Sequence, residues 1–202
     1  MLSHVSQLAA RTLRRTVAAG ASRRAATSAA AAEVSSSATS PLPFTEEDIP
    51  AIVDATERRV MSIFTECGGN DYIGEPFSIT EHSVQTAAAA RAAGETDEAV
   101  LSCLLHDIGH MIGLEAGTPP GMDGCGTEEH ERIGAEFLGQ LGFSDVASYL
   151  ALHHVNAKRY KCAKDPAYLA KLSDASVTTL RHQGGPMSEE ECAEVEADPR
   201  WP

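Results

Sequence analysis

Four histidines and one aspartate stand out in the sequence, because side chains of these two types bind metal ions. The histidines recur at equal intervals of 24 residues, and the full set is His82, His106, Asp107, His130 and His154. An interval of this length corresponds to about one helix and its loop, so successive helices can each direct one imidazole toward a common centre. Four imidazoles and a carboxylate exceed what one tetrahedral zinc ion needs, and no thiolate accompanies them. The set therefore favours iron or manganese, with two ions bound.

Two of these residues, His106 and Asp107, lie inside an apolar segment. Apolar side chains recur with helical spacing between residues 100 and 112, which predicts one helix with a buried face. Burying an imidazole and a carboxylate is costly unless something pairs with them, and a metal ion is the simplest common partner. His110 follows His106 by one helical turn, so we expect these two rings to share a face. Any single histidine could be an ordinary core or surface residue, but the complete set argues for a metal centre.

The helices that must position these residues are indicated by apolar spacing and by capping residues. Apolar residues make up 43% of the chain and aromatic residues only 5%, which favours helices over a sandwich or a barrel. Thr96 and Thr127 are expected N-caps, and Ser188 with Glu191 forms a predicted capping box. No segment alternates as a strand does. We therefore expect an all-α bundle of about six to seven helices, over about residues 45–67, 79–93, 96–112, 127–141, 144–157, 166–182 and from 188 onward.

The N-terminal part of the chain has a different composition from the rest. Residues 1–32 contain five arginines and no acidic residue and are rich in Ala and Ser, which is typical of an organellar transit peptide. We expect a mitochondrial protein, with a plastid as the alternative location; a disordered N-terminal tail is the other explanation. Residues 33–43 are predicted to be a linker, and residues 44–202 to be one domain.

The charge of the chain limits the kinds of partner that it can have. The formal net charge is −13, and because residues 1–32 contribute five positive charges, the remainder carries −18. A domain this acidic does not favour binding to nucleic acid or to an anionic membrane surface. No apolar run approaches the roughly 18 residues of a transmembrane helix. The five cysteines are scattered without a Cys-x-x-Cys pair, so we expect free thiols.

The order His, His-Asp, His, His resembles the ligand series of the HD-domain superfamily, a helical and metal-dependent fold. Most members are phosphohydrolases, and a smaller branch consists of mixed-valent di-iron oxygenases. From about residue 46 to the end, this chain is similar to the members of that branch that cleave phosphonates. The stretches that carry the similarity are residues 72–75, 106–110, 154–160, 172–176 and 183–188. The first, third and last are the most specific, because ordinary HD hydrolases do not share them.

The resemblance implies a role for each matching residue. Two iron ions, Fe(II) and Fe(III), would be bound by His82, His106, His130 and His154, and the carboxylate of Asp107 would bridge them. In the resembled enzymes, the tyrosine of a Tyr-x-x-Glu loop occupies an iron position until the substrate arrives. Tyr72 would therefore act as a gate that keeps dioxygen from the reduced site, and Glu75 would position a substrate amine. A simple structural role for Tyr72 as a loop anchor is the alternative.

The resemblance also implies a substrate pocket next to the metal ions. Lys158 lies one turn after His154, and its ammonium group would bind a phosphonate oxygen together with the hydroxyl groups of Ser176 and Thr179. His110 would contact the substrate hydroxyl. His153, Arg159 and His182 are expected to be structural, and Asp174 is not expected to be a ligand.

The C-terminal end departs from the resembled pattern. Those enzymes carry a last aspartate ligand on a final helix, preceded by an arginine that binds the phosphonate. This sequence ends in Asp-Pro-Arg-Trp-Pro, and neither residue is in the expected place. We expect that the domain is incomplete at its C-terminus; an iron site that lacks one ligand is the alternative.

We predict a di-iron, O2-dependent oxygenase that cleaves the carbon–phosphorus bond of a small 1-hydroxyphosphonate, such as 2-amino-1-hydroxyethylphosphonate, to phosphate and a carboxylic acid. The sequence leaves the amine substituent of the substrate open. An HD-type phosphohydrolase of a nucleotide or other phosphate ester would need the same His-Asp core, but gives no reason for the stretches at 72–75 and 154–160. A degenerate, non-catalytic metal-binding protein is the third possibility, because of the missing aspartate.

Overall fold

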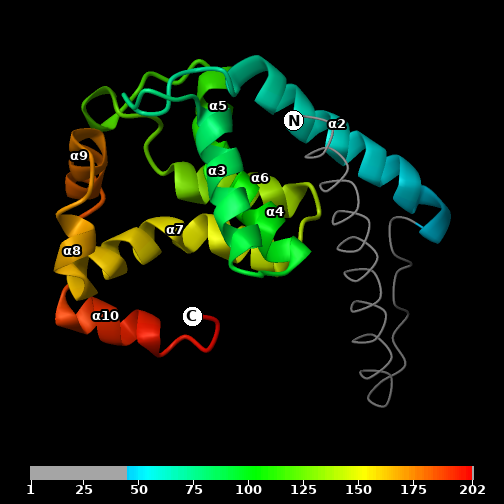
Figure 1. The fold of residues 1–202 in the computed structure, drawn as a ribbon. Coiled ribbons are helices and arrows are strands. Elements are labelled where there is room, and N and C mark those ends of the chain that lie inside the picture. Colours follow the sequence, from blue (N-terminus) through cyan, green and yellow to red (C-terminus); the bar gives the residue numbers. More distant parts are fainter. Residues whose placement is uncertain (1–44, 202) are drawn as a thin grey trace, which may run out of the picture.

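The computed structural model describes residues 45–201, in which helices are joined by loops (Figure 1). No strand occurs within these residues, where an isolated antiparallel bridge joins Asp71 to Ser78. The predicted all-α class is therefore confirmed. The elements in chain order are η1 (Glu46–Asp48), α2 (Ile49–Cys67), α3 (Ile79–Ala92), α4 (Asp97–Leu105), α5 (Ile108–Glu115), η2 (Met122–Gly124), α6 (His130–Gln140), α7 (Asp145–Lys164), α8 (Pro166–Leu169), α9 (Asp174–His182) and α10 (Glu189–Glu196).

The helices pack around a centre made by α4, α5, α6 and α7. Helix α2 packs on α5, α5 on α6, and α6 on α7, while α4 contacts both α3 and α7 (Figure 1). The short helix α8 continues from the far end of α7, with α9 and α10 on either side of it. The expected transit peptide and linker, residues 1–43, lie outside the described residues.

The hydrophobic core lies between these helices and includes the apolar face predicted for residues 100–112. Each fully buried aliphatic side chain of this kind stabilises the fold by about 1.5–3 kcal/mol. The least exposed core side chains are Val53, Ile63, Leu105, Ile108, Met111, Leu138 and Ala151. Core residues Leu105 and Ile108 flank Asp107 along the chain. Well-packed helices therefore hold this candidate metal ligand in place.

The expected single helix over residues 96–112 is wrong, because the chain leaves the helical conformation at Asp107. Helix α4 ends at Leu105 and α5 begins at Ile108. Asp107 has φ −100° and ψ 13°, in the bridge region where active-site residues often occur. The α5 backbone then comes so close to α6 that a Cβ atom on Gly109 would lie 1.9 Å from the carbonyl oxygen of His130. Close packing of α5 on α6 thus accompanies the change in direction.

The expected helix over residues 166–182 is also divided, into α8 and α9. The hydroxyl of Ser173 accepts a hydrogen bond from the backbone N–H of Ser176, which makes Ser173 the N-cap of a new helix. Helix α7 is longer than expected and continues to Lys164. The side chain of Asp165 then caps α8.

Thr127 is not the N-cap that the sequence predicted. Helix α6 begins at His130, after Glu129 in the left-handed conformation with φ +54°. The hydroxyl of Thr127 instead donates a hydrogen bond to the carbonyl oxygen of His110, and both residues are buried. Thr127 therefore connects α5 to the start of α6.

Two predicted helix caps are confirmed. Ser188 and Glu191 form the capping box of α10, and Thr96 caps α4. All five cysteines are free thiols. No helix within residues 45–201 is long and apolar enough to span a membrane.

Candidate metal centre

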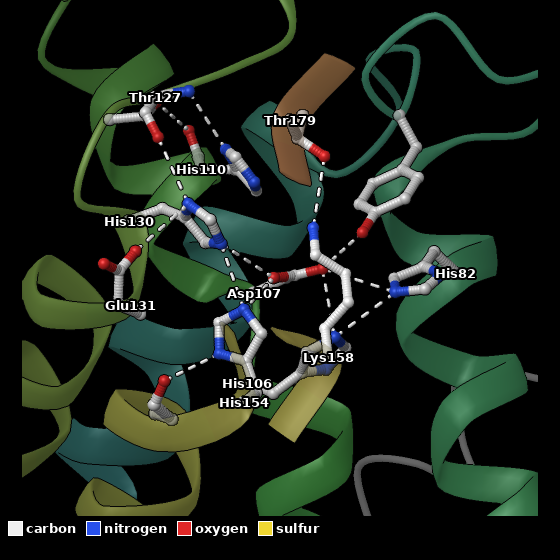
Figure 2. A network of polar contacts seen from close by, with 12 residues as sticks. His82, His106, Asp107, His110, Thr127, His130, Glu131, His154, Lys158 and Thr179 are labelled. Carbon is white, nitrogen blue, oxygen red and sulfur yellow. Dashed lines mark hydrogen bonds and ion pairs between the residues drawn. The ribbon is translucent and has the colours of Figure 1, made fainter. Parts of the chain in front are cut away.

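Four imidazoles from separate segments converge on the carboxylate of Asp107 (Figure 2). His82 comes from α3, His106 from the turn between α4 and α5, His130 from the first position of α6, and His154 from α7. The Nε2 atoms of His82 and His106 are 3.2 Å apart, and those of His130 and His154 are 3.0 Å apart. We call these five residues the histidine–aspartate cluster.

The cluster divides into two halves that share Asp107. Its Oδ2 atom lies 3.3 Å from Nε2 of His82 and 3.0 Å from Nε2 of His106. Its Oδ1 atom lies 3.4 Å from Nε2 of His130 and 3.1 Å from Nε2 of His154. Each oxygen of one carboxylate thus faces its own pair of imidazoles. The three ligand atoms of each half lie within 4.8 Å of one another, which is compatible with one metal ion in each half.

Backbone carbonyl groups orient three of the four rings. The Nδ1 atoms of His106, His130 and His154 lie 2.7, 3.2 and 2.7 Å from the carbonyl oxygens of Cys103, Thr127 and Ala151. A carbonyl oxygen can only accept a hydrogen bond, so Nδ1 carries a proton. The Nε2 atom then either carries a second proton that Asp107 accepts or presents a lone pair to a cation. Lone pairs that face one another at about 3 Å need a proton or a cation between them. The donor set therefore fits metal ions, and outer partners of this kind are usual for metal-bound histidines.

Asp107 is 1% exposed and remains anionic. Burial by itself would raise its pKa, but the charge of His106 and hydrogen bonds from His106, His130 and His154 hold the pKa of Asp107 well below its ordinary value. A carboxylate that is buried, anionic and surrounded by nitrogen donors is suited to bridging two cations.

The loop before α3 places Tyr72 over one half of the cluster. Its hydroxyl donates a hydrogen bond of 2.8 Å to Oδ2 of Asp107, and its ring stacks on His82 with centroids 4.0 Å apart. Burial, together with the charge of Asp107, raises the pKa of Tyr72 well above its ordinary value, so the phenol stays protonated. Ile73 and Gly74 have positive φ angles of 41° and 80°, which give the loop the turn that directs Tyr72 inward.

A cavity of about 410 Å³ opens beside the cluster. All eleven residues that the sequence predicts to bind metal or substrate, or to act in catalysis, line it. The ammonium group of Lys158 donates a hydrogen bond of 3.1 Å to the hydroxyl of Thr179, as Figure 2 shows. Ser176 and Glu75 also line this cavity, and the carboxylate of Glu75 accepts a hydrogen bond from Ser173. Burial lowers the pKa of Lys158.

His110 reaches the cavity by a different geometry from the one predicted. Because the chain turns at Asp107, His106 and His110 do not lie on one face of a continuous helix. The ring of His110 stacks on His130 with centroids 3.8 Å apart, and its Nδ1 accepts a hydrogen bond from the backbone N–H of Thr127 at 3.0 Å. Burial lowers the pKa of His110 to about 3, so the ring is neutral and donates through Nε2.

The residues expected to be structural lie outside the cavity lining. The ring of His153 packs against Tyr149, Arg159 bonds to Gly185 and Glu191, and His182 lies beside Asp123. Near the C-terminus, Asp198 accepts hydrogen bonds from Tyr149 and from Arg200. Neither Asp198 nor Arg200 lines the cavity.

Sequence reasoning missed several residues that contribute to this site. Thr127 holds the ring of His110 in place, whereas the sequence indicated Thr127 only as an N-cap. Gln183 lines the cavity with a buried Oε1 atom that has no hydrogen-bond partner within residues 45–201. It belongs to the stretch 183–188, which carries part of the family resemblance but indicates no role for a single residue. Lys161 and Tyr168 also line the cavity, and no sequence signal indicated them.

Comparisons with known proteins agree with this geometry. Residues 79–193 match the HD domain. A 1-hydroxy-2-(trimethylamino)ethylphosphonate dioxygenase (glycine-betaine-forming) from Leisingera caerulea is 44% identical over 137 residues, which cover 68% of this chain and 68% of that protein. A hydroxymethylphosphonate dioxygenase from Gimesia maris is 32% identical over 154 residues, 75% of this chain and 76% of that protein. An uncharacterized protein, L432 of Acanthamoeba polyphaga mimivirus, is 40% identical over 141 residues, and the chain covers 64% of its length. This protein belongs to the HD-domain family.

Proposed function

We propose that this protein is a di-iron, O2-dependent oxygenase that cleaves the carbon–phosphorus bond of a small 1-hydroxyphosphonate. The observation that carries the proposal is the arrangement of Asp107, each of whose two oxygens faces a separate pair of imidazoles. The names of the two related phosphonate dioxygenases support the substrate class and the use of dioxygen.

His82 and His106 would hold one iron ion in this proposal, and His130 and His154 would hold the other, with the carboxylate of Asp107 available to both. Two histidines and one carboxylate form the ligand set of many non-haem iron oxygenases, in which further coordination positions stay open. When bound, the irons supply Lewis acidity and the electrons that activate dioxygen. The chain supplies the spacing of the ions and the space beside them.

Lys158, Thr179 and Ser176 bind the phosphonate group at one side of the cavity. The ammonium group and the two hydroxyls offer hydrogen-bond donors to an anion, and Lys158 already bonds to Thr179 at 3.1 Å. His110 donates through Nε2 to the substrate hydroxyl, because its Nδ1 is occupied by Thr127. Glu75 accepts a hydrogen bond from a substrate amine.

Tyr72 controls access to the half of the cluster that contains His82. Its phenol contacts Oδ2 of Asp107 at 2.8 Å, so a chelating substrate must displace it before the substrate's own oxygens can approach. The hydrogen bond to Asp107 is one that water or substrate can replace.

The overall reaction consumes one dioxygen molecule for each phosphonate. The carbon–phosphorus bond breaks, the carbon that carried the hydroxyl is oxidised to a carboxylic acid, and phosphorus leaves as phosphate. For 2-amino-1-hydroxyethylphosphonate, the products are glycine and phosphate, and all atoms balance.

Oxygen uptake and phosphate release by the iron-loaded full chain test this proposal. We expect uptake that depends on a 1-hydroxyphosphonate, with one phosphate released for each oxygen consumed. Lys158→Met should raise the KM for the phosphonate, whereas Lys164→Met, an exposed lysine on the same helix, is the matched control. Phosphate release from a phosphate ester in the absence of oxygen would instead indicate an HD-type phosphohydrolase. Weak or single-metal binding without turnover would indicate a non-catalytic metal-binding protein.

A further inference from the structure

Lys161 and Tyr168 form a contact in the wall of the cavity that the proposed mechanism does not use. The Lys161 Nζ atom lies 4.7 Å from the centroid of the Tyr168 ring, and both residues line the cavity. The face of an aromatic ring attracts cations through its quadrupole, and this distance is within the range of a cation–π interaction. The Tyr168 ring therefore already contacts a cation in the cavity wall.

The lining of the same cavity contains the carboxylate of Glu75 as well as the ammonium groups of Lys158 and Lys161. Glu75 lines the same cavity, and its carboxylate is held by the hydroxyl of Ser173, the N-cap of α9. Tyr168 lies on α8, which precedes that cap, and it lines the cavity. Lys161 has no carboxylate partner within the described part of the chain. Its ammonium group rests on the ring without an ion pair.

A second lysine on α7 shows what an ordinary surface contact of this type looks like. Lys164 lies one turn after Lys161, with its Nζ atom 5.4 Å from the centroid of the Tyr160 ring. It also forms an ion pair of 2.9 Å with Glu196, and neither Lys164 nor Tyr160 lines the cavity. The two pairs share one helix and one type of contact, but only the Lys161–Tyr168 pair borders the site.

We propose that the Tyr168 ring is the subsite for a cationic substituent of the phosphonate, and that Lys161 occupies this subsite when no substrate is bound. This inference rests on the proposed function, which places the phosphonate group at Lys158 and Thr179. A primary or quaternary ammonium group on the neighbouring carbon replaces the Lys161 ammonium on the ring, and a primary ammonium group still donates its hydrogen bond to Glu75. Lys161 is exposed, so it can turn to solvent as the substituent enters.

The exchange makes a definite prediction about affinity. A cationic substituent must displace Lys161, so part of its interaction with the ring is offset by the contact that is lost. Removing the Lys161 charge abolishes that competition and also removes repulsion between two cations. Substrates with an ammonium group should then bind more tightly, and a phosphonate without a charged substituent should not.

The test compares three phosphonates by anaerobic calorimetry on the iron-loaded full chain. The ligands are hydroxymethylphosphonate, 2-amino-1-hydroxyethylphosphonate and its trimethylammonium analogue. Lys161→Met should lower the Kd of both cationic ligands on the order of 5-fold relative to hydroxymethylphosphonate, whereas Lys164→Met should leave the ratios unchanged. Tyr168→Leu should shift the ratios in the opposite direction, and Tyr168→Phe, which keeps the ring, should preserve them.

Two results would overturn the inference without touching the proposed function. One is binding of all three phosphonates with ratios that neither Lys161→Met nor Tyr168→Leu changes. The other is weaker binding of all three ligands by Lys161→Met to the same degree, which would make Lys161 a ligand of the phosphonate group. By contrast, a wild-type chain that binds iron but none of the three ligands would contradict the proposed function itself.

Discussion

The two halves of the histidine–aspartate cluster have the same ligand types but different surroundings. On the Oδ1 side, His130 is fixed by the Thr127 carbonyl and by the stacked ring of His110. On the Oδ2 side, the additional contact comes from Tyr72, which lies on a loop and reaches the same carboxylate oxygen as His82 and His106. One half is therefore backed by a buried imidazole, and the other is covered by a phenol on a loop. Under the proposed function, we expect substrate to enter on the Oδ2 side.

Changing Asp107 should produce the largest effect, because this residue belongs to both halves. Asp107→Asn removes the anionic charge and the ability to bridge two cations, so both iron ions should be lost. Activity should fall on the order of 1,000-fold or more, as expected for the loss of several kcal/mol of transition-state stabilisation. Iron analysis of the purified variant and oxygen uptake check this outcome. Retention of both ions would show that Asp107 does not join the halves.

Removing one histidine should separate the halves. His154→Ala should lose the ion on the Oδ1 side, and His82→Ala the ion on the Oδ2 side, so each variant retains about one iron ion per chain. His153→Ala is the matched control, because His153 neighbours His154 but packs against Tyr149. Equal loss of iron from the His153 and His154 variants would refute the ligand assignment.

The packed half should be sensitive to the distance between α5 and α6. Gly109→Ala introduces a Cβ atom only 1.9 Å from the His130 carbonyl oxygen, and the backbone must shift to accommodate it. We expect a loss of about 1–3 kcal/mol in the free energy of unfolding and weaker binding of the ion at His130. Denaturation of the metal-free protein measures the first effect.

The control for this prediction is Gly139→Ala in α6, where the nearest atom to an added Cβ is Ser148 Oγ at an ordinary 3.7 Å. That change should be neutral or stabilising by up to about 1 kcal/mol. Equal destabilisation by both substitutions would mean that the close approach at Gly109 is not a constraint.

The smallest effect should come from a change to Tyr72, whose hydroxyl contacts the Oδ2 side of the cluster. Tyr72→Phe keeps the ring stacked on His82 but removes the hydrogen bond to Asp107. Iron content should not change, while oxygen consumption without substrate should rise by about fivefold, the effect of losing one hydrogen bond worth about 1 kcal/mol. Tyr149→Phe, which loses a hydroxyl contact to Asp198 away from the cavity, is the control. Unchanged background consumption would mean that Tyr72 is only a loop anchor.

The sequence predicted the helices and the convergence of residues better than it predicted the local backbone. Apolar spacing identified the buried face that contains Ile108 and Met111, because helical periodicity and burial are properties of a whole segment. The turn at Asp107 leaves no signal in the local sequence. It accompanies the tertiary packing of α5 against His130. The division at Ser173 had only a weak signal, because serine is a favoured N-cap residue but also occurs inside helices.

In the site, too, the sequence predicted the types of residue better than it predicted their geometry. Residue types and the resemblance to HD-domain oxygenases identified the residues that line the cavity, but no pattern indicated which oxygen of Asp107 each imidazole would face. The contact of Thr127 with His110 and that of Lys161 with Tyr168 join separate elements. Contacts of this kind depend on the packed structure and leave no periodic trace in the sequence.

The central claim is that Asp107 joins two iron sites, and spectroscopy of the iron-loaded full chain tests it most directly. Mössbauer and electron paramagnetic resonance spectra should be recorded together with the iron content, before and after partial reduction. The account predicts two iron ions per chain that are magnetically coupled through the shared carboxylate, with the coupling absent in Asp107→Asn. A single iron ion per chain, or two ions with independent signals, would contradict it.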